Sequence, residues 1–319
     1  MRENIIVPAW NSVIHATSIK KFNFFPAFLG ILWLSMIILY QITFTYVQVF
    51  HKKDEFFSVL DRFIHATYFT ETITGVILIF LCYIFISPIA EAGVIQMIHH
   101  EKENTIPNHK SLSWISGFFR WCAYFLPIFE LQNMLSIFRL ISVITFYILL
   151  LRIFWKEYFL SISVIMGIYL LFSFCLNMFF AYAPFFIIFE NKKAFEALAL
   201  STQMAIHNIE VTSHLYFTLL LVYLRTIIIA IIFIILPFII SWVLAFITTI
   251  SIKIVFLIFA WISIGWFLLF VSHLNSVLEI FMHSIWYHAY IENKKLGFIH
   301  TWTQNDTSEK HDDHHHSGG

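Results

Sequence analysis

Charged residues are scarce in this chain. Only 12% of its 319 residues are Asp, Glu, Lys or Arg, about half the fraction found in typical soluble domains. Apolar residues make up 60% of the sequence, and the mean hydropathy is +0.80. A folded body of this size has too few polar groups to cover its surface. Much of the exterior must therefore face lipid, and the composition predicts an integral membrane protein.

Several other signals are also missing. The formal net charge is zero, so nothing points to a nucleic-acid partner. Cys82, Cys122 and Cys175 are isolated, lack metal-ligand spacing and are odd in number, so they give no disulfide framework. Glycine and proline number only 9 and 7, which weighs against a transporter built from interrupted helices. The first 23 residues lack a cleavable signal, so we expect insertion to begin with a retained helix.

Signatures of catalysis are absent from the sequence. It has neither a Gly-x-Ser-x-Gly elbow nor a glycine-rich phosphate loop, and no predicted span contains Asp. The run that starts at His100 resembles a His-Glu-x-x-His zinc motif, but Asn104 replaces the second histidine. His99 and Glu103 could still bind a metal with other ligands, although interfacial side chains are the favoured interpretation. We therefore expect no enzymatic activity, no metal and no cofactor.

Six apolar stretches are long enough to cross a bilayer, which requires about 20 helical residues. Helices are expected because backbone groups in lipid must be satisfied within their own segment. The predicted spans are residues 24–50, 72–97, 131–154, 158–186, 215–244 and 250–280.

Basic residues are unequally divided between the two sides of these spans. Eleven Lys and Arg lie in the N-terminal segment, the loops near 98–120 and 190–210 and the C-terminal tail, against six on the opposite side. Because basic residues are enriched in cytoplasmic loops, we expect both termini to be cytoplasmic. Lys52, Lys53 and Arg62 run against this bias.

An internal repeat is also indicated. The second, fourth and sixth spans end in similar acidic and Asn-containing exits at residues 101–104, 190–193 and 292–295. Before each odd span lies a shorter amphipathic segment, at 10–19, 112–122 and 195–206, with apolar residues at helical spacing. Asn191 is a candidate cap for the third. The sequence thus predicts one membrane domain over 1–300 with units 8–104, 105–191 and 192–293, although chance similarity in a Phe- and Ile-rich chain is the alternative.

The tail at 301–319 is polar and is expected to be disordered. Its His-rich run could bind a metal loosely, but a solvated tail is the favoured interpretation.

Ionisable side chains inside predicted spans are candidates for function because they are costly there. Alignment of the exits places Glu91 and Glu279 at similar depths, with Asn177 or its neighbour Met178 at the same depth in the fourth span. Arg139 and Arg225 lie at roughly equivalent depths in the third and fifth spans. These residues form a predicted intramembrane polar cluster, with pairs such as Glu91–Arg225 or Glu279–Arg139. The pairs either hold the bundle together or line a polar cavity or proton path.

The segment AYAPFFIIFENKKAFEALALSTQMA at 181–205 resembles a pattern found in YciC-type bacterial inner-membrane proteins and in the membrane domain of some glycerophosphodiester phosphodiesterases. The pattern joins a proline within a span, an acidic exit, and an amphipathic helix with Ala and Ser. Pro184, Glu190, Ala197 and Ser201 match it, whereas the aromatic residue that often follows the Ser is replaced by Thr202. The resemblance implies a six-span protein of the bacterial inner membrane, without a phosphodiesterase catalytic domain.

Three functional hypotheses follow. The first is a multipass, non-enzymatic protein of the membrane-organising or partner-binding type, because flat amphipathic helices insert into lipid surfaces. Its partners would be membrane lipids and either another protein or a second copy of the chain. The second is a small permease or lipid transporter using the polar cluster. The third is an enzyme acting on lipids.

Overall fold

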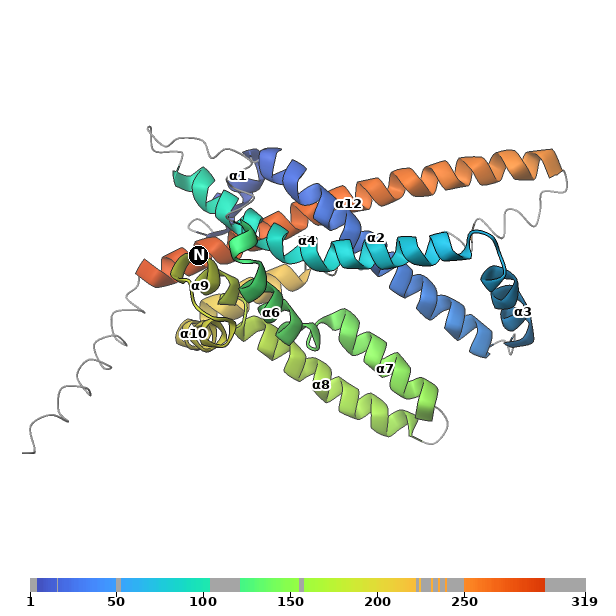
Figure 1. Cartoon of the computed structure of the whole chain (residues 1–319). Helices are drawn as coiled ribbons and strands as arrows, with labels where there is room; N and C mark the ends of the chain where they lie inside the picture. Colours follow the sequence, from blue (N-terminus) through green and yellow to red (C-terminus); the bar gives the residue numbers. More distant parts are fainter. Residues whose placement is uncertain are drawn as a thin grey trace, which may run out of the picture. The chain divides into compact units, whose positions relative to one another are not determined.

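The computed structural model describes residues 5–15, 17–49, 53–103, 121–154, 158–221, 224, 231, 235, 239 and 250–295 of the chain (Figure 1). Helices and short connections account for these residues, and no strand occurs among them. The all-α class expected from the continuous apolar runs is therefore confirmed for the described part of the chain.

The chain forms two compact units, each assembled from separate stretches of sequence. Unit 1 comprises Met1–His15, Ile95–Leu221 and Phe281–Gly319, and unit 2 comprises Ala16–Val94 and Val222–Ile280. Two long helices, α4 (Phe69–Glu103) and α12 (Ile250–Lys295), contribute residues to both. Neither unit therefore corresponds to one continuous segment.

Unit 1 contains most of the short helices. They are α1 (Val7–His15), α6 (Phe125–Ser136), α7 (Leu140–Phe154), α8 (Phe159–Phe179), α9 (Ala183–Glu190), α10 (Ala194–His207) and the segment Ile209–Leu221. The C-terminal ends of α4 and α12 complete the unit.

The core of unit 1 is dense. Among the described residues, the largest fully buried side chains all belong to this unit: Tyr182, Tyr287, Tyr290, Phe185, Phe186, Ile95, Ile98, Ile128, Leu131, Ile187, Met204 and Leu215. α9 is apolar on all sides until Glu190, as expected for a helix surrounded by protein. Fully buried alanines such as Ala183, Ala197 and Ala289 allow the helix backbones to approach closely.

Unit 2 is built from α2 (Thr17–Val49), α3 (Lys53–Ile64) and most of α4 and α12. Pro26 and Pro88 lie inside α2 and α4, where membrane helices tolerate proline. Trp33 of α2 packs on Phe80 of α4, with ring centroids 4.8 Å apart. Elsewhere the long helices expose apolar side chains, as a lipid-facing surface requires.

In the described part of the chain, four helical segments are long and apolar enough to cross a membrane: Thr17–Gln41, Phe69–Lys102, Phe159–Glu190 and Ile254–Lys295. A fifth is obtained if the bent pair α6 and α7 counts as one span. These segments indicate a membrane protein. Of the predicted fifth span at 215–244, only the beginning and a few later residues are described.

The predicted third span differs from the observed helices. Instead of one helix over 131–154, α6 ends at Ser136, α7 begins at Leu140, and the two are bent by 40°. No glycine or proline lies in the break at Ile137, Phe138 and Arg139. The bend instead coincides with tertiary hydrogen bonds from α8.

The three predicted surface helices differ in how the structure describes them. Residues 195–206 lie within α10, and residues 10–19 fall on two helices, α1 and the start of α2. Of residues 112–122, only Trp121 and Cys122 are among the described residues, so that prediction lies mostly outside them. The short helix that directly precedes α7 is α6.

Candidate functional site

The exits of the three even-numbered predicted spans meet at one end of unit 1. Glu190, the last residue of α9, accepts hydrogen bonds at Oε1 from the Tyr290 hydroxyl at 2.7 Å and from Lys294 Nζ at 3.1 Å. Lys102, near the end of α4, places its Nζ 5.5 Å from the ring centroid of Tyr287. We call Glu190, Tyr290, Lys294, Tyr287 and Lys102 the exit cluster.

Aromatic rings pack against one another next to these charged side chains. Phe189 is stacked on Tyr290 at 6.0 Å and contacts Tyr287 at 5.9 Å. The His99 ring lies 4.9 Å from Phe189, and its Nδ1 is 2.7 Å from the Tyr287 hydroxyl. Lys294 Nζ lies 5.8 Å from the Tyr290 centroid, within cation–π range. Charged heads over aromatic rings are typical of a membrane–water boundary.

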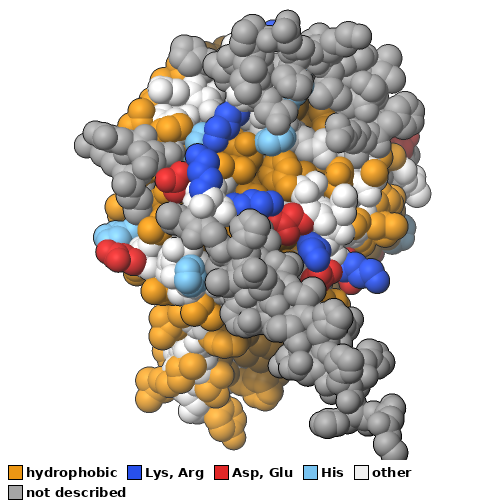
Figure 2. All heavy atoms as spheres, turned by 90° about the vertical axis from the view of Figure 1, so that its left-hand side faces the viewer, with side chains coloured by type: hydrophobic (Ala, Val, Ile, Leu, Met, Phe, Trp, Pro, Cys, Tyr) orange, Lys and Arg blue, Asp and Glu red, His pale blue; other side chains and the backbone are white. Residues whose placement is uncertain are grey.

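Figure 2 views the molecule from the side on which α9 and α10 lie in Figure 1. Lysine, acidic and histidine side chains gather there around a patch of hydrophobic side chains. In the connection between α9 and α10, Lys192 Nζ donates a hydrogen bond to Glu196. That hydrogen bond raises the pKa of Lys192 above its ordinary value.

A buried polar network lies next to the exit cluster. Ser201 Oγ donates to the Phe179 carbonyl at 2.7 Å and accepts from the Tyr182 N–H at 3.1 Å. The Tyr182 hydroxyl lies 3.1 Å from Thr212 Oγ1 and accepts from Asn293 Nδ2 at 3.4 Å. Tyr182, Ser201, Thr212 and Asn293 are all buried, and the hydrogen bonds offset the cost of removing them from water.

The network explains the local fold between α8 and α9. Helix α8 ends at Phe179 and α9 begins at Ala183, so backbone groups at this junction need partners outside their own helices. Ser201 supplies two of them from α10. Pro184 lies in the first turn of α9, where the missing N–H has no helical partner in any case.

The structure gives each residue of the resemblance motif a structural place. Pro184 lies in the first turn of α9, Glu190 hydrogen-bonds α9 to α12, Ser201 joins α10 to the α8–α9 junction, and Ala197 is fully buried. These contacts describe the motif in this chain and assign no reaction to it.

Asn191 caps a helix end, but a different one from that expected. It is the left-handed C-cap of α9, with φ 54° and ψ 33°, whereas the N-cap of α10 is Lys193. The N–H groups of Asn191 and Lys192 both donate to the Phe186 carbonyl. Asparagine tolerates this conformation better than most residues, so the expected N-cap role is wrong for a physical reason that the residue type itself suggests.

Among the predicted cluster residues, Glu279 has clear partners in unit 2. Its Oε2 accepts from Asn23 Nδ2 at 2.9 Å and its Oε1 accepts from Asn275 Nδ2 at 2.9 Å. The Asn23 amide also donates to the Ser276 carbonyl at 3.3 Å. Asn23 and Ser276 are buried. The carboxylate is thus held by neutral amides, a role that the sequence analysis did not assign to either asparagine.

Asn177 stabilises the broken helix pair in unit 1. Its Nδ2 donates to the Phe138 carbonyl at 2.7 Å, and Ser173 Oγ donates to the same carbonyl. The Tyr169 hydroxyl donates to the Ile137 carbonyl at 3.1 Å. Tyr169, Ser173 and Asn177 recur every four residues on one face of α8. This polar stripe supplies donors to carbonyls that the break removes from the helical pattern.

The remaining cluster residues are not brought together by the described contacts. Arg139 is exposed at the break between α6 and α7, and Glu91 is half-buried on α4. Arg225 lies outside the described residues. The pairs Glu91–Arg225 and Glu279–Arg139 stay predictions.

In the described part of the chain, no three His, Cys, Asp or Glu side chains are grouped to hold a metal ion. His99 instead contacts Tyr287 and Phe189 as given above. Sequence reasoning also missed Tyr182, Tyr290 and Asn293, because their role depends on contacts between distant segments. The comparisons with known proteins give no matching family model, no curated relative and no solved structure.

Proposed function

We propose that the chain is a non-enzymatic multipass membrane protein of the membrane-organising type, acting on lipid through short helices at the membrane surface. The observation that carries this proposal is the same in three helices of unit 1. Each of them buries some of its residues within the unit and leaves at least one large apolar side chain exposed.

The exposed side chains are bulky. Trp10 and Ile14 of α1 are 51% and 48% exposed, Leu126 of α6 is 71% exposed, and Phe195 and Ile206 of α10 are 69% and 58% exposed. The opposite faces are buried through residues such as Val13, Ile128 and Ala197 in the same helices. Helices of 9 to 14 residues are too short to cross the hydrocarbon. Apolar groups on such helices insert shallowly into a leaflet.

The intramembrane polar groups support the same proposal. Glu279 is held by Asn23 and Asn275, and Asn177 bonds the Phe138 carbonyl. Side chains engaged in this way stabilise helix contacts, whereas a carrier presents such groups to its solute. The proposed role therefore needs lipids as partners, and either another protein or a second copy of the chain where the protein assembles.

We further propose six spans, cytoplasmic termini, a bacterial inner-membrane location and a threefold repeat. The convergence of the three exits in unit 1 supports placing them on one side of the membrane. The repeat keeps the units 8–104, 105–191 and 192–293, and its second surface helix, at residues 112–122, lies mostly outside the described residues. The location rests on the resemblance to YciC-type proteins.

A small permease or lipid transporter is a second candidate, and one observation favours it. The pair α6 and α7 is a broken span with a polar stripe facing the break. Discontinuous helices often form substrate sites near the bilayer midplane. In this chain the stripe bonds the carbonyls at the break, which favours a structural role for it.

Reconstitution into lipid vesicles tests the proposal. The parent protein should change lipid order, measured with a polarity-sensitive lipid probe, and the Trp10→Ser/Phe195→Ser variant should lose most of that effect. Phe172→Ser on α8, where Phe172 is 54% exposed, is the matched control and should keep it. Thermal unfolding in detergent checks that each variant is folded.

Solute flux into the same vesicles separates the two candidates. The proposal predicts flux no greater than in protein-free vesicles. Saturable uptake that Glu279→Gln abolishes, together with unchanged lipid order, would contradict it and establish the transporter instead.

A further inference from the structure

Helix α3 is a fourth amphipathic helix, and it lies in unit 2 between two long helices. Its 12 residues, KDEFFSVLDRFI, span about 18 Å at 1.5 Å per residue. This is too short to cross a hydrocarbon core of about 30 Å. α2 precedes α3 and α4 follows it, and both contain segments able to cross the membrane. Chain continuity therefore places α3 at a membrane surface.

The apolar face of α3 is exposed. Phe57, Leu60 and Ile64 are 61%, 37% and 47% exposed, and their spacing of three and then four residues places them on one stripe. Phe63 lies to one side of this stripe and packs edge-on against Phe69 of α4, with centroids 5.4 Å apart. That contact fixes the corner between α3 and α4 without covering the stripe.

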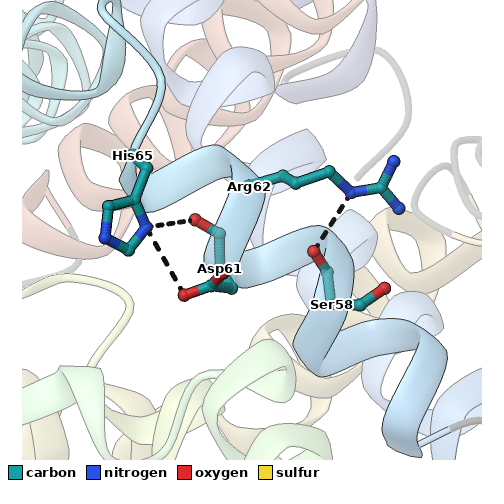
Figure 3. Close-up of polar contacts among 4 residues, drawn as sticks. All are labelled: Ser58, Asp61, Arg62 and His65. Carbon is teal, nitrogen blue, oxygen red and sulfur yellow. Dashed lines mark hydrogen bonds and ion pairs between the residues drawn. The ribbon is translucent and has the colours of Figure 1, made fainter.

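The polar face of α3 is bonded to the helix itself, as Figure 3 shows. Arg62 Nε donates to the Ser58 carbonyl at 3.2 Å. His65 Nδ1 lies 2.8 Å from the Asp61 carbonyl and 3.4 Å from the Asp61 carboxylate. The side chains of Asp61 and His65 are about three-quarters exposed, at 74% and 75%. Polar and apolar side chains of α3 are thus both exposed, and Ser58, Arg62 and His65 lie on the side of the helix away from Leu60.

In unit 2, α3 runs across the direction of α2 and α4 rather than along it (Figure 1). If those two helices cross the bilayer, α3 lies parallel to its plane. The two neighbouring helices also expose apolar surfaces, including Leu39 and Tyr40 of α2 and Ile77 of α4. Those surfaces face lipid, and the stripe extends them to the boundary.

We propose that α3 binds the bilayer surface, inserting Phe57, Leu60 and Ile64 among the lipids and keeping Asp61 and Arg62 in water. The charges of α3 nearly cancel, with Lys53 and Arg62 against Asp54, Glu55 and Asp61. Anionic headgroups therefore attract it little, and apolar burial is the driving force. The inference goes beyond the proposed function, since it holds for a scaffold or a transporter.

Spin labels on the full chain test this orientation. After replacement of Cys82, Cys122 and Cys175 by Ser, nitroxides are attached at Leu60→Cys or, as the matched control on the polar face, at Ser58→Cys. In phosphatidylcholine vesicles, the label at 60 should collide mainly with oxygen, which concentrates in lipid. The label at 58 should collide mainly with a water-soluble nickel chelate.

Other outcomes overturn the proposal. Nickel access at both positions places α3 in water, and low access to both reagents at position 60 indicates coverage by a second copy or by the rest of the chain. Repeating the measurement with phosphatidylglycerol in the vesicles tests whether headgroup charge contributes to binding. An unchanged insertion depth of the label at position 60 supports binding through apolar burial. Insertion that occurs only with the anionic lipid contradicts it.

Discussion

Units 1 and 2 are held together by different physical means. Unit 1 contains the largest fully buried aromatic and aliphatic side chains of the described chain and a buried network from Tyr182 to Asn293. In unit 2, packing such as Trp33 on Phe80 is supplemented by the amide–carboxylate contacts of Glu279. Among the described residues, the most deeply buried large side chains therefore lie in unit 1, whereas a polar contact joins two helices of unit 2.

A single helix can also have different surroundings along its length, as α12 does. Helix α12 has 46 residues. It is therefore roughly 70 Å long, more than twice the hydrocarbon thickness. Its last turns carry Ile285, Tyr287 and Tyr290, which are nearly or fully buried in unit 1. Its earlier part exposes Phe259 and Trp266. One helix thus serves as a lipid-facing span and, further along, as a core element.

The largest expected effect is in the core of unit 1. Phe186→Ala should lower the free energy of unfolding by about 3–5 kcal/mol, because it opens a cavity among fully buried side chains. Unfolding followed by denaturant titration in detergent measures this. Phe85→Ala on α4 is the matched control, since Phe85 is 53% exposed, and it should change stability by no more than about 0.5 kcal/mol. Equal losses of stability in the two variants would contradict the proposed difference between the units.

The Ser201 hydroxyl should have the next largest effect. Ser201→Ala leaves the Tyr182 N–H and the Phe179 carbonyl without this partner, at a cost of about 1–3 kcal/mol. Thr202→Val is the control, because its hydroxyl donates to the Leu198 carbonyl within α10. The same detergent titration compares them. A loss for Thr202→Val as large as that for Ser201→Ala would show that the network adds no specific stability.

In unit 2, Asn23→Leu should cost about 1.5 kcal/mol, because one of two amide donors to Glu279 is removed while Asn275 remains. Adding Glu279→Gln should recover part of the loss, since a neutral amide needs less compensation than a carboxylate. The double-mutant cycle isolates this coupling. Additive losses would mean that the Asn23–Glu279 contact does not link α2 to α12.

The smallest effect is expected at the exit cluster. Lys294→Met removes the ion pair with Glu190, and the lysine side chain is 44% exposed, so the cost should be about 0.2–1 kcal/mol. Lys193→Met at an exposed neighbouring position is the control. High salt should reduce the Lys294→Met effect. A loss that persists unchanged in high salt would point to packing on Tyr290 instead.

Much of the architecture could be predicted because apolar runs of membrane length leave the backbone little choice except helix. Helix α3 could also have been predicted, because Phe57, Leu60 and Ile64 follow a helical spacing between the first two predicted spans. The break at Ile137–Arg139 could not be predicted, since neither Gly nor Pro marks it and it coincides with hydrogen bonds from the donor stripe on α8.

The candidate sites were predictable only in part. A carboxylate within a predicted span, such as Glu279, needs a partner, and this much followed from the sequence. That its partners are Asn23 and Asn275 depends on how α2 meets α12, which residue spacing does not encode. Tyr290 was missed as the partner of Glu190 for the same reason, since 100 residues separate the two along the chain.

Access of water to the polar contacts of unit 2 tests most directly whether the intramembrane polar groups are structural. In a chain with its three native cysteines replaced, Ser276→Cys places a thiol at a fully buried position beside Asn23. The account predicts no reaction with a membrane-impermeant thiol reagent applied from either side of reconstituted vesicles, while Asp61→Cys on α3 reacts. Labelling of Ser276→Cys from one side in the folded protein would contradict the account and reveal an aqueous path to Glu279.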